Sequence, residues 1–120
     1  MGRNFDYELR RFLDCVEGNK YSVTSAAIRL YVMLNHIAKR TQTPEISGTH
    51  GEICALCGFA DKTRETALKY LVDIRVIRYV QGRSRIPTIY ALTETNEWSS
   101  EFKDVFYQTG WEEYKEGAEK

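Results

Sequence analysis

Basic side chains gather between residues 61 and 85, and they are the groups in this sequence with the clearest chemical use. The window contains seven Lys or Arg against three Asp or Glu, a net charge of +4. Guanidinium and ammonium groups bind phosphate oxygens, and a guanidinium can grip a paired acceptor edge with two N–H donors. Charges on a helix are more often a solvated surface face. Whether these side chains bind phosphate or only form a solvated face depends on how the helices and strands that contain the window are arranged.

The rest of the chain offsets this charge. Residues 1–93 contain 14 Lys or Arg and 9 Asp or Glu, a net +5, whereas residues 94–120 contain 3 and 8, a net −5. A basic segment beside an acidic tail is an asymmetry that overall neutrality conceals. The zero net charge of the chain therefore does not exclude a polyanionic partner.

A second chemical pattern is formed by His50, Cys54 and Cys57, which are spaced to face one side of a helix. Three ligands from one short helix rarely surround Zn²⁺ without a fourth. Small apolar core residues are the favoured interpretation of both cysteines. We therefore predict no metal and no cofactor, and we expect His36 on the exposed or boundary face of its helix.

Residues suited to catalysis are not apparent: there is no glycine-rich phosphate loop and no nucleophile beside an obvious base. An enzyme is not expected. The 120 residues suit a single domain, 1–120. No apolar run approaches the ~20 residues that cross a bilayer, and no signal peptide is recognisable. Three cysteines fit reduced thiols in a cytoplasm.

Two amphipathic helices are predicted in the first third of the chain. Residues 5–16 place apolar side chains at helical spacing. A second helix, capped by Thr24 or Ser25, is expected to run to about Arg40 with a long apolar stripe. Ile46 is a candidate for a short strand.

A short helix and a longer one are predicted next. Thr49 and Glu52 match a capping box ahead of the apolar run ICALC, and Gly58 suits the left-handed residue that ends a helix. The longer helix is expected to start with Asp61 as its N-cap and to reach about Ile74.

A β hairpin is predicted after this helix. Residues 76–80 and 88–92 are rich in β-branched and aromatic side chains, which favour strands. The six residues 82–87, GRSRIP, supply the turn between them.

The segment 94–120 is acidic and aromatic. A helix there would align Trp98, Phe102 and Phe106 along one side. Such an apolar face needs a partner, which is either the N-terminal helix of the same chain or a dimer or partner interface.

The order of these elements resembles a winged helix-turn-helix domain over about residues 22–93, followed by the tail 94–120. The most specific stretch is EICALCGFADKTRETALKYLVDIRVIRYV, which is similar to a pattern of bacterial, plasmid and phage DNA-binding proteins. The sequence departs from the pattern at Ala60, where Ser or Thr is frequent, and at residues 74–76, where a glycine usually precedes the first wing strand. The matching residues are Glu52, Ile53, Gly58, Phe59, Thr63, Ala67, Leu68, Leu71 and Ile77.

This resemblance implies a mostly α fold with a small β-hairpin wing and added N-terminal and C-terminal helices. It also implies that the helix from residue 61 to 74 enters the major groove of double-stranded DNA, with Arg64 suited to guanine and the lysines to phosphate. The wing arginines are expected on the backbone or in a minor groove. The implied DNA-binding residues are Lys62, Thr63, Arg64, Thr66, Lys69, Arg83 and Arg85.

The expected function is sequence-specific DNA binding by a transcriptional regulator or by a replication or partition factor of a plasmid or phage. We expect a cytoplasmic, nucleoid-associated homodimer without membrane contact, joined through its terminal helices. The alternative is a winged-helix protein-interaction module that binds through Trp98, Phe102 and Phe106. A metal sensor built on the histidine and cysteine pattern is a third hypothesis.

Overall fold

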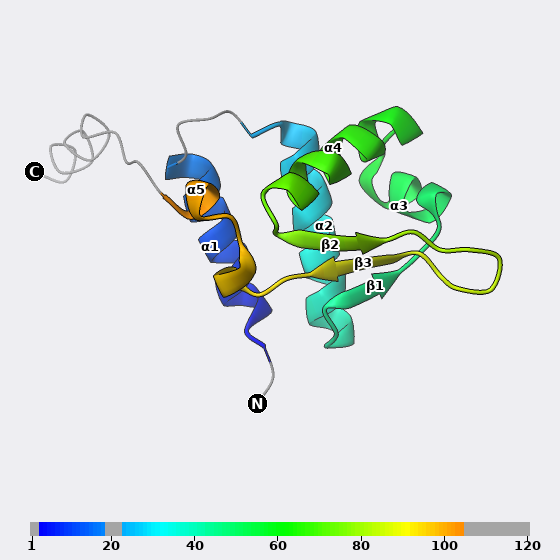
Figure 1. Ribbon diagram of the computed structural model, residues 1–120, viewed down its shortest axis with the longest axis horizontal. Coiled ribbons are helices and arrows are strands. Elements are labelled where there is room, and N and C mark those ends of the chain that lie inside the picture. Colours follow the sequence, from blue (N-terminus) through cyan, green and yellow to red (C-terminus); the bar gives the residue numbers. More distant parts are fainter. Residues whose placement is uncertain (1–2, 19–22, 105–120) are drawn as a thin grey trace, which may run out of the picture.

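The computed structural model describes residues 3–18 and 23–104. In these residues helices pack around a small antiparallel sheet, so the predicted mostly α fold with a β-hairpin wing is confirmed. Figure 1 shows the wing at one end of the molecule, with α1 and α5 near the other. The elements are α1 (Phe5–Gly18), α2 (Ser25–Thr41), β1 (Glu45–Ser47), α3 (His50–Cys57), α4 (Asp61–Asp73), β2 (Ile77–Val80), β3 (Ile89–Leu92), a 3-10 turn η1 (Thr95–Glu97) and α5 (Ser100–Lys103).

Helix α2 is the central element of the core. The Thr24 side chain accepts a hydrogen bond from the Ala27 backbone N–H at 3.2 Å, which confirms one of the two predicted caps. The buried face of α2 packs against α1, α3, α4 and the sheet (Figure 1). It consists of Ala27, Leu30, Tyr31, Leu34, Asn35 and Ala38.

Helix α3 begins with the predicted capping box. The Glu52 backbone N–H donates to the Thr49 hydroxyl at 3.1 Å, and the Thr49 backbone N–H donates to the Glu52 carboxylate at 3.0 Å. These hydrogen bonds lower the pKa of Glu52. The helix ends at Gly58, whose φ of 72° is the left-handed conformation expected there.

Helix α4 starts differently from the prediction. Its N-cap residue is Ala60, and within the described residues no side chain caps it. Asp61 is instead the first helical residue, and its carboxylate accepts a hydrogen bond from Arg64 at 3.0 Å. The predicted Asp61 N-cap is therefore wrong, because the carboxylate is turned toward a cation within the helix rather than toward the backbone N–H groups.

The end of α4 shows how the chain turns into β2 without the glycine that usually precedes the first wing strand. Arg75 has φ of 64°, and the Val76 backbone N–H donates to the Leu71 carbonyl at 3.1 Å. The Arg75 N–H donates to the Val72 carbonyl at 3.0 Å. This pair of hydrogen bonds is a Schellman motif with Arg75 in the left-handed position that usually holds glycine. The helix-to-strand corner therefore forms without a glycine.

The sheet has the strand order β1-β3-β2, with both pairings antiparallel. Ile46, Tyr90 and Tyr79 lie in one cross-strand row. Beyond β2 and β3, Arg83 and Ile86 form a further bridge, which leaves Ser84 and Arg85 as the two-residue tip. We call residues 81–88 the wing. The predicted hairpin and the short strand at Ile46 are confirmed.

The segment after β3 returns to the N-terminal half of the chain. Trp98 and Phe102 are 3% and 2% exposed and join the core. Phe12 stacks on Tyr31 with ring centroids 4.0 Å apart, and both rings meet the Trp98 ring edge-on at 6.3 Å. Of the two partners that the sequence allows for these aromatic side chains, the structure places Trp98 and Phe102 within their own chain. Phe106 lies outside the described residues.

Candidate nucleic-acid interface

The exposed residues of α4 include four of the five candidates on this helix. Lys62, Thr63, Thr66 and Lys69 are all exposed. Three of them, Lys62, Thr66 and Lys69, follow helical spacing along one face. The Thr66 hydroxyl donates to the Lys62 carbonyl at 3.0 Å, so this side chain lies against its own helix.

Carboxylates accompany these lysines. Asp61, Glu65 and Asp73 are also exposed on α4. The exposed surface of the helix is therefore not strongly basic, although the sequence window that contains it has a net charge of +4. Residues 61–73 contain three basic and three acidic residues, so the excess positive charge of the window comes from the residues after α4, namely Arg75, Arg78, Arg83 and Arg85.

The wing has a clearer positive charge. Arg83 and Arg85 are exposed, and the segment 81–88, QGRSRIPT, contains no Asp or Glu. Arg78, just before the wing, is also exposed but forms an ion pair with Glu97 at 3.3 Å. Positive potential available to a polyanion is thus concentrated at the wing tip rather than along α4.

Arg64 corrects the sequence analysis most directly. Its side chain is 4% exposed, so the expectation that it faces solvent to read guanine is wrong. Its guanidinium donates to Asp61 at 3.0 Å, to the Tyr90 hydroxyl at 3.3 Å and to His50 Nδ1 at 3.4 Å. Burial alone lowers the pKa of Arg64, but the hydrogen bonds and the neighbouring Asp61 raise it overall, which keeps the group charged.

His50 extends this network to β2, the strand that leads into the wing. Its Nε2 lies 2.9 Å from the Tyr79 hydroxyl, and the Tyr79 ring meets the Tyr90 ring edge-on at 5.2 Å. Side chains from α3, α4, β2 and β3 are therefore joined by hydrogen bonds and ring contacts. In the sequence, His50 has the pattern of a metal ligand only; the signal for the network is that Tyr79 and Tyr90 occupy strand positions that face the helices.

The cysteines of the same pattern are placed separately. Cys57 is buried, and burial raises the pKa of its thiol, in agreement with its interpretation as a core residue. Cys54 is half-buried, with its Sγ 3.9 Å from Asp61. Among the described residues there is no group of three or more His, Cys, Asp or Glu arranged to hold a metal ion. His36 is exposed, as expected.

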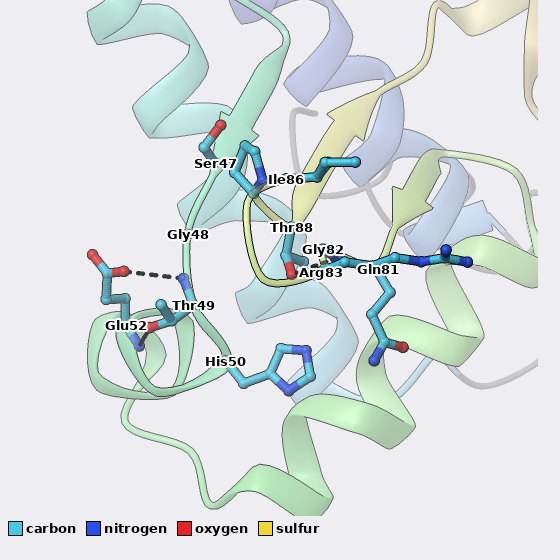
Figure 2. A pocket seen from close by; sticks show the side chains of 11 residues that line it. Ser47, Gly48, Thr49, His50, Glu52, Gln81, Gly82, Arg83, Ile86 and Thr88 are labelled. Carbon is cyan, nitrogen blue, oxygen red and sulfur yellow. Dashed lines mark hydrogen bonds between the residues drawn. The ribbon is translucent and has the colours of Figure 1, made fainter.

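Two grooves flank the base of the wing, each of about 530 Å³. The first lies between α4 and β2, and its lining includes Arg64, Leu68 and Lys69. The second lies between the start of α3 and the wing, and Figure 2 shows its lining side chains. His50 and Gln81 line both grooves, and in Figure 2 they extend into the same space from α3 and from the wing.

Comparison with known proteins gives no assignment: no family model, curated protein or solved structure matches the chain. Within residues 3–18 and 23–104, no helix is long and apolar enough to cross a membrane.

Two of the three aromatic residues of the predicted partner interface, Trp98 and Phe102, are buried. Trp98 and Phe102 contact Phe12 and each other, with ring centroids between 5.6 and 6.3 Å apart. An interface through these two side chains would require them to leave the core.

Proposed function

We propose that this chain binds double-stranded DNA in a sequence-specific manner, with α4 in the major groove and the wing on the flanking backbone. The observation that carries the proposal is the pair of exposed arginines, Arg83 and Arg85, in the wing of a hairpin that follows directly on α3 and α4. A transcriptional regulator or a replication or partition factor of a plasmid or phage would use this activity, in a cytoplasmic setting.

Helix α4 supplies the groove-entering part of the proposed interface. Lys62, Thr66 and Lys69 lie along its exposed face, where two ammonium groups can contact phosphates and a hydroxyl can contact a base edge or phosphate. Thr63 lies beside them in the first turn. The Glu65 carboxylate also lies on this exposed surface. We therefore expect α4 to contribute base contacts and orientation on the duplex more than overall electrostatic attraction. Arg64 is not part of this contact set, since its donors are occupied within the protein.

The wing supplies the electrostatic part. A guanidinium at a hairpin tip can contact phosphates or enter a narrow minor groove, where negative potential is enhanced. Each phosphate contact adds about 0.9 to the slope of log K against log salt, so the few contacts available here predict binding that is weak at high salt and strengthens moderately as salt is lowered.

Salt dependence of binding tests the proposal. Affinity for a duplex of about 20 base pairs is measured by fluorescence anisotropy at several salt concentrations between about 50 and 200 mM. Arg85→Ala is expected to reduce the slope of log K against log salt by about one unit, because one phosphate contact is lost. The matched control is Arg10→Ala, which removes an exposed cation from α1, far from the wing (Figure 1), and should leave the slope unchanged.

Sequence specificity is tested by selecting bound duplexes from a random pool. Enrichment of a defined site, lost in Thr66→Ala but retained in Lys69→Ala and Arg85→Ala, is the expected result, since phosphate contacts carry little base information. A wild-type protein that ignores duplex DNA at 50 mM salt, or enriches no site, contradicts the proposal.

A further inference from the structure

We infer that His50, in its neutral form, is the positioning residue that fixes the wing relative to α4. His50 is the first residue of α3, and it lines both grooves that separate the wing from the helices. It contacts Arg64 of α4 on one ring nitrogen and Tyr79 of β2 on the other. It is thus the side chain through which both helices are tied to the strand that leads into the wing.

Donor and acceptor chemistry determines where the proton of His50 lies. A guanidinium has N–H donors and no acceptor, so His50 Nδ1, at 3.4 Å from Arg64 Nη2, must be the acceptor. A neutral imidazole then carries its proton on Nε2. That N–H donates to the Tyr79 hydroxyl at 2.9 Å. The network is complete only when His50 is in the Nε2–H tautomer.

A second proton on His50 is incompatible with this arrangement. It would occupy Nδ1 and point at the Arg64 guanidinium, placing two donors and two positive charges against each other. Asp61, the carboxylate that accepts from Arg64 in the described part of the chain, is already hydrogen-bonded to the guanidinium. Arg64 remains held by Asp61 and Tyr90, so the contact that breaks is the one from Arg64 to His50.

Other ionisable groups line the same grooves as His50 or join its network, and they come from every element packed around it. They are Glu52 on α3, Asp61, Glu65 and Lys69 on α4, Tyr79 on β2, Tyr90 on β3 and Arg83 on the wing. Glu52 is engaged in the capping box, and Glu65 shares its groove with Lys69. A proton on Nδ1 would therefore break the contact between His50 and Arg64 and release the base of the wing from α4.

The consequence for DNA rests on the proposed function. If α4 and the wing contact one duplex together, the distance between them determines which DNA geometry both can contact at once. His50 fixes that distance. The positioning role itself concerns the protein alone, so it is tested first without DNA.

Nuclear magnetic resonance of the ring nitrogens is the direct test. The chain has two histidines, and His36 is exposed on α2, so His36→Gln leaves His50 as the sole histidine. At pH 8 its ring nitrogens are expected to report the Nε2–H tautomer. A proton found on Nδ1 would overturn the inference, because Arg64 could not then donate to that atom.

Protection of wing amides against hydrogen exchange measures the positioning role. In Tyr79→Phe, which removes one of the two contacts of the His50 ring, the protection factors of Arg83 and Ile86 are expected to fall about fivefold relative to wild type, the size of one lost internal hydrogen bond. His50→Ala removes both contacts and is expected to lower the same protection factors at least as far. Wild-type protection at Arg83 and Ile86 in both variants would contradict the inference.

DNA binding provides a separate readout. Tyr79→Phe is expected to lower the affinity for DNA several-fold, because the contact that ties His50 to β2 is lost. If no variant binds DNA but the tautomer and exchange results hold, the proposed function fails and the positioning role stands. If the wild-type protein binds DNA but the exchange results do not hold, the positioning role fails and the proposed function stands.

Discussion

Arg64 directs its donors into the protein, toward Asp61, Tyr90 and His50. In the sequence it is indistinguishable from Lys62 or Lys69, which lie within five residues of it and face solvent. The difference follows from helical geometry, since Arg64 projects from the same side as Ala67, Leu68 and Leu71. At the scale of single residues, whether a basic side chain is available to a ligand depends on the groups that it contacts in the fold, and not on its lying in a basic segment of the sequence.

Arg75 has a backbone conformation that is unfavourable for a residue with a Cβ atom. Its φ of 64° lies in the left-handed region, which costs a residue with a Cβ roughly 1 kcal/mol relative to glycine. The side chain is exposed, and the contact that anchors this corner, from the Thr93 hydroxyl to the Arg75 carbonyl at 2.6 Å, involves only backbone of Arg75.

Arg75→Gly is therefore expected to raise the free energy of unfolding by about 1 kcal/mol. Urea denaturation followed by circular dichroism measures the change. Arg75→Ala is the control, because it removes the charge but keeps the Cβ and the strain, and it should leave stability within about 0.5 kcal/mol of wild type. A glycine variant no more stable than the alanine variant would show that the conformation is not strained.

At the scale of elements, the wing depends on the close approach of its two arms. Gly82 lies where the strands converge before the tip, and a Cβ there would come within 2.4 Å of the Ile86 carbonyl oxygen and 2.5 Å of the Thr88 nitrogen. Both contacts are with backbone, so no side-chain rotation can relieve them. The Gly82 N–H also donates to the Thr88 hydroxyl at 2.9 Å.

Gly82→Ala should separate the arms and break the Arg83–Ile86 bridge while leaving the core folded, because no residue from 81 to 88 belongs to the buried core. Hydrogen exchange should become faster at Arg83 and Ile86 but not at Leu71 in α4. Gly51→Ala is the matched control, since its Cβ would meet only the Thr49 hydroxyl at 3.9 Å. Unchanged hydrogen exchange at Arg83 and Ile86 would mean that the two arms of the wing are farther apart at Gly82 than they are in the structure.

At the scale of the whole molecule, the chain after β3 completes the core that α1 and α2 begin. Trp98 lies edge-on to both Phe12 and Tyr31, and its indole N–H donates to the Thr93 carbonyl at 3.4 Å. From the other terminus, Arg3 donates to the carbonyls of Leu92 and Thr93 at 2.9 and 2.8 Å and pairs with Glu8. Segments from both ends of the described chain thus close over the end of the sheet.

Trp98→Ala is expected to lower the free energy of unfolding by about 3–5 kcal/mol, because a large buried side chain is removed and the cavity relaxes only partly. Circular dichroism during urea denaturation is a suitable measurement, since it does not depend on the deleted indole. Glu101→Ala changes an exposed position in α5 and should cost less than about 0.5 kcal/mol. A loss below 1 kcal/mol for Trp98→Ala would place this side chain outside the cooperative core.

The sequence alone determined the local elements of this protein. The capping box at Thr49, the left-handed Gly58 and the alternating strands after residue 76 each depend on neighbours within a few residues, so they could be predicted without a structure. The same locality explains why the wing arginines were predicted exposed at a turn. It also explains the error at Asp61, where local capping preference favoured a bond to the backbone and Arg64 competed for the carboxylate.

Only the tertiary structure decided which of these residues face solvent and which meet one another. The joining of His50, Arg64, Tyr79 and Tyr90 brings together residues up to 40 positions apart, and no periodicity in the chain encodes such a contact. Likewise, an aromatic stripe has the same pattern whether it covers its own core or a partner, and folding resolved this for Trp98 and Phe102 by burying them. Hydrogen bonding and burial between distant elements set these outcomes, because they depend on how the elements pack and not on the order of residues within any one of them.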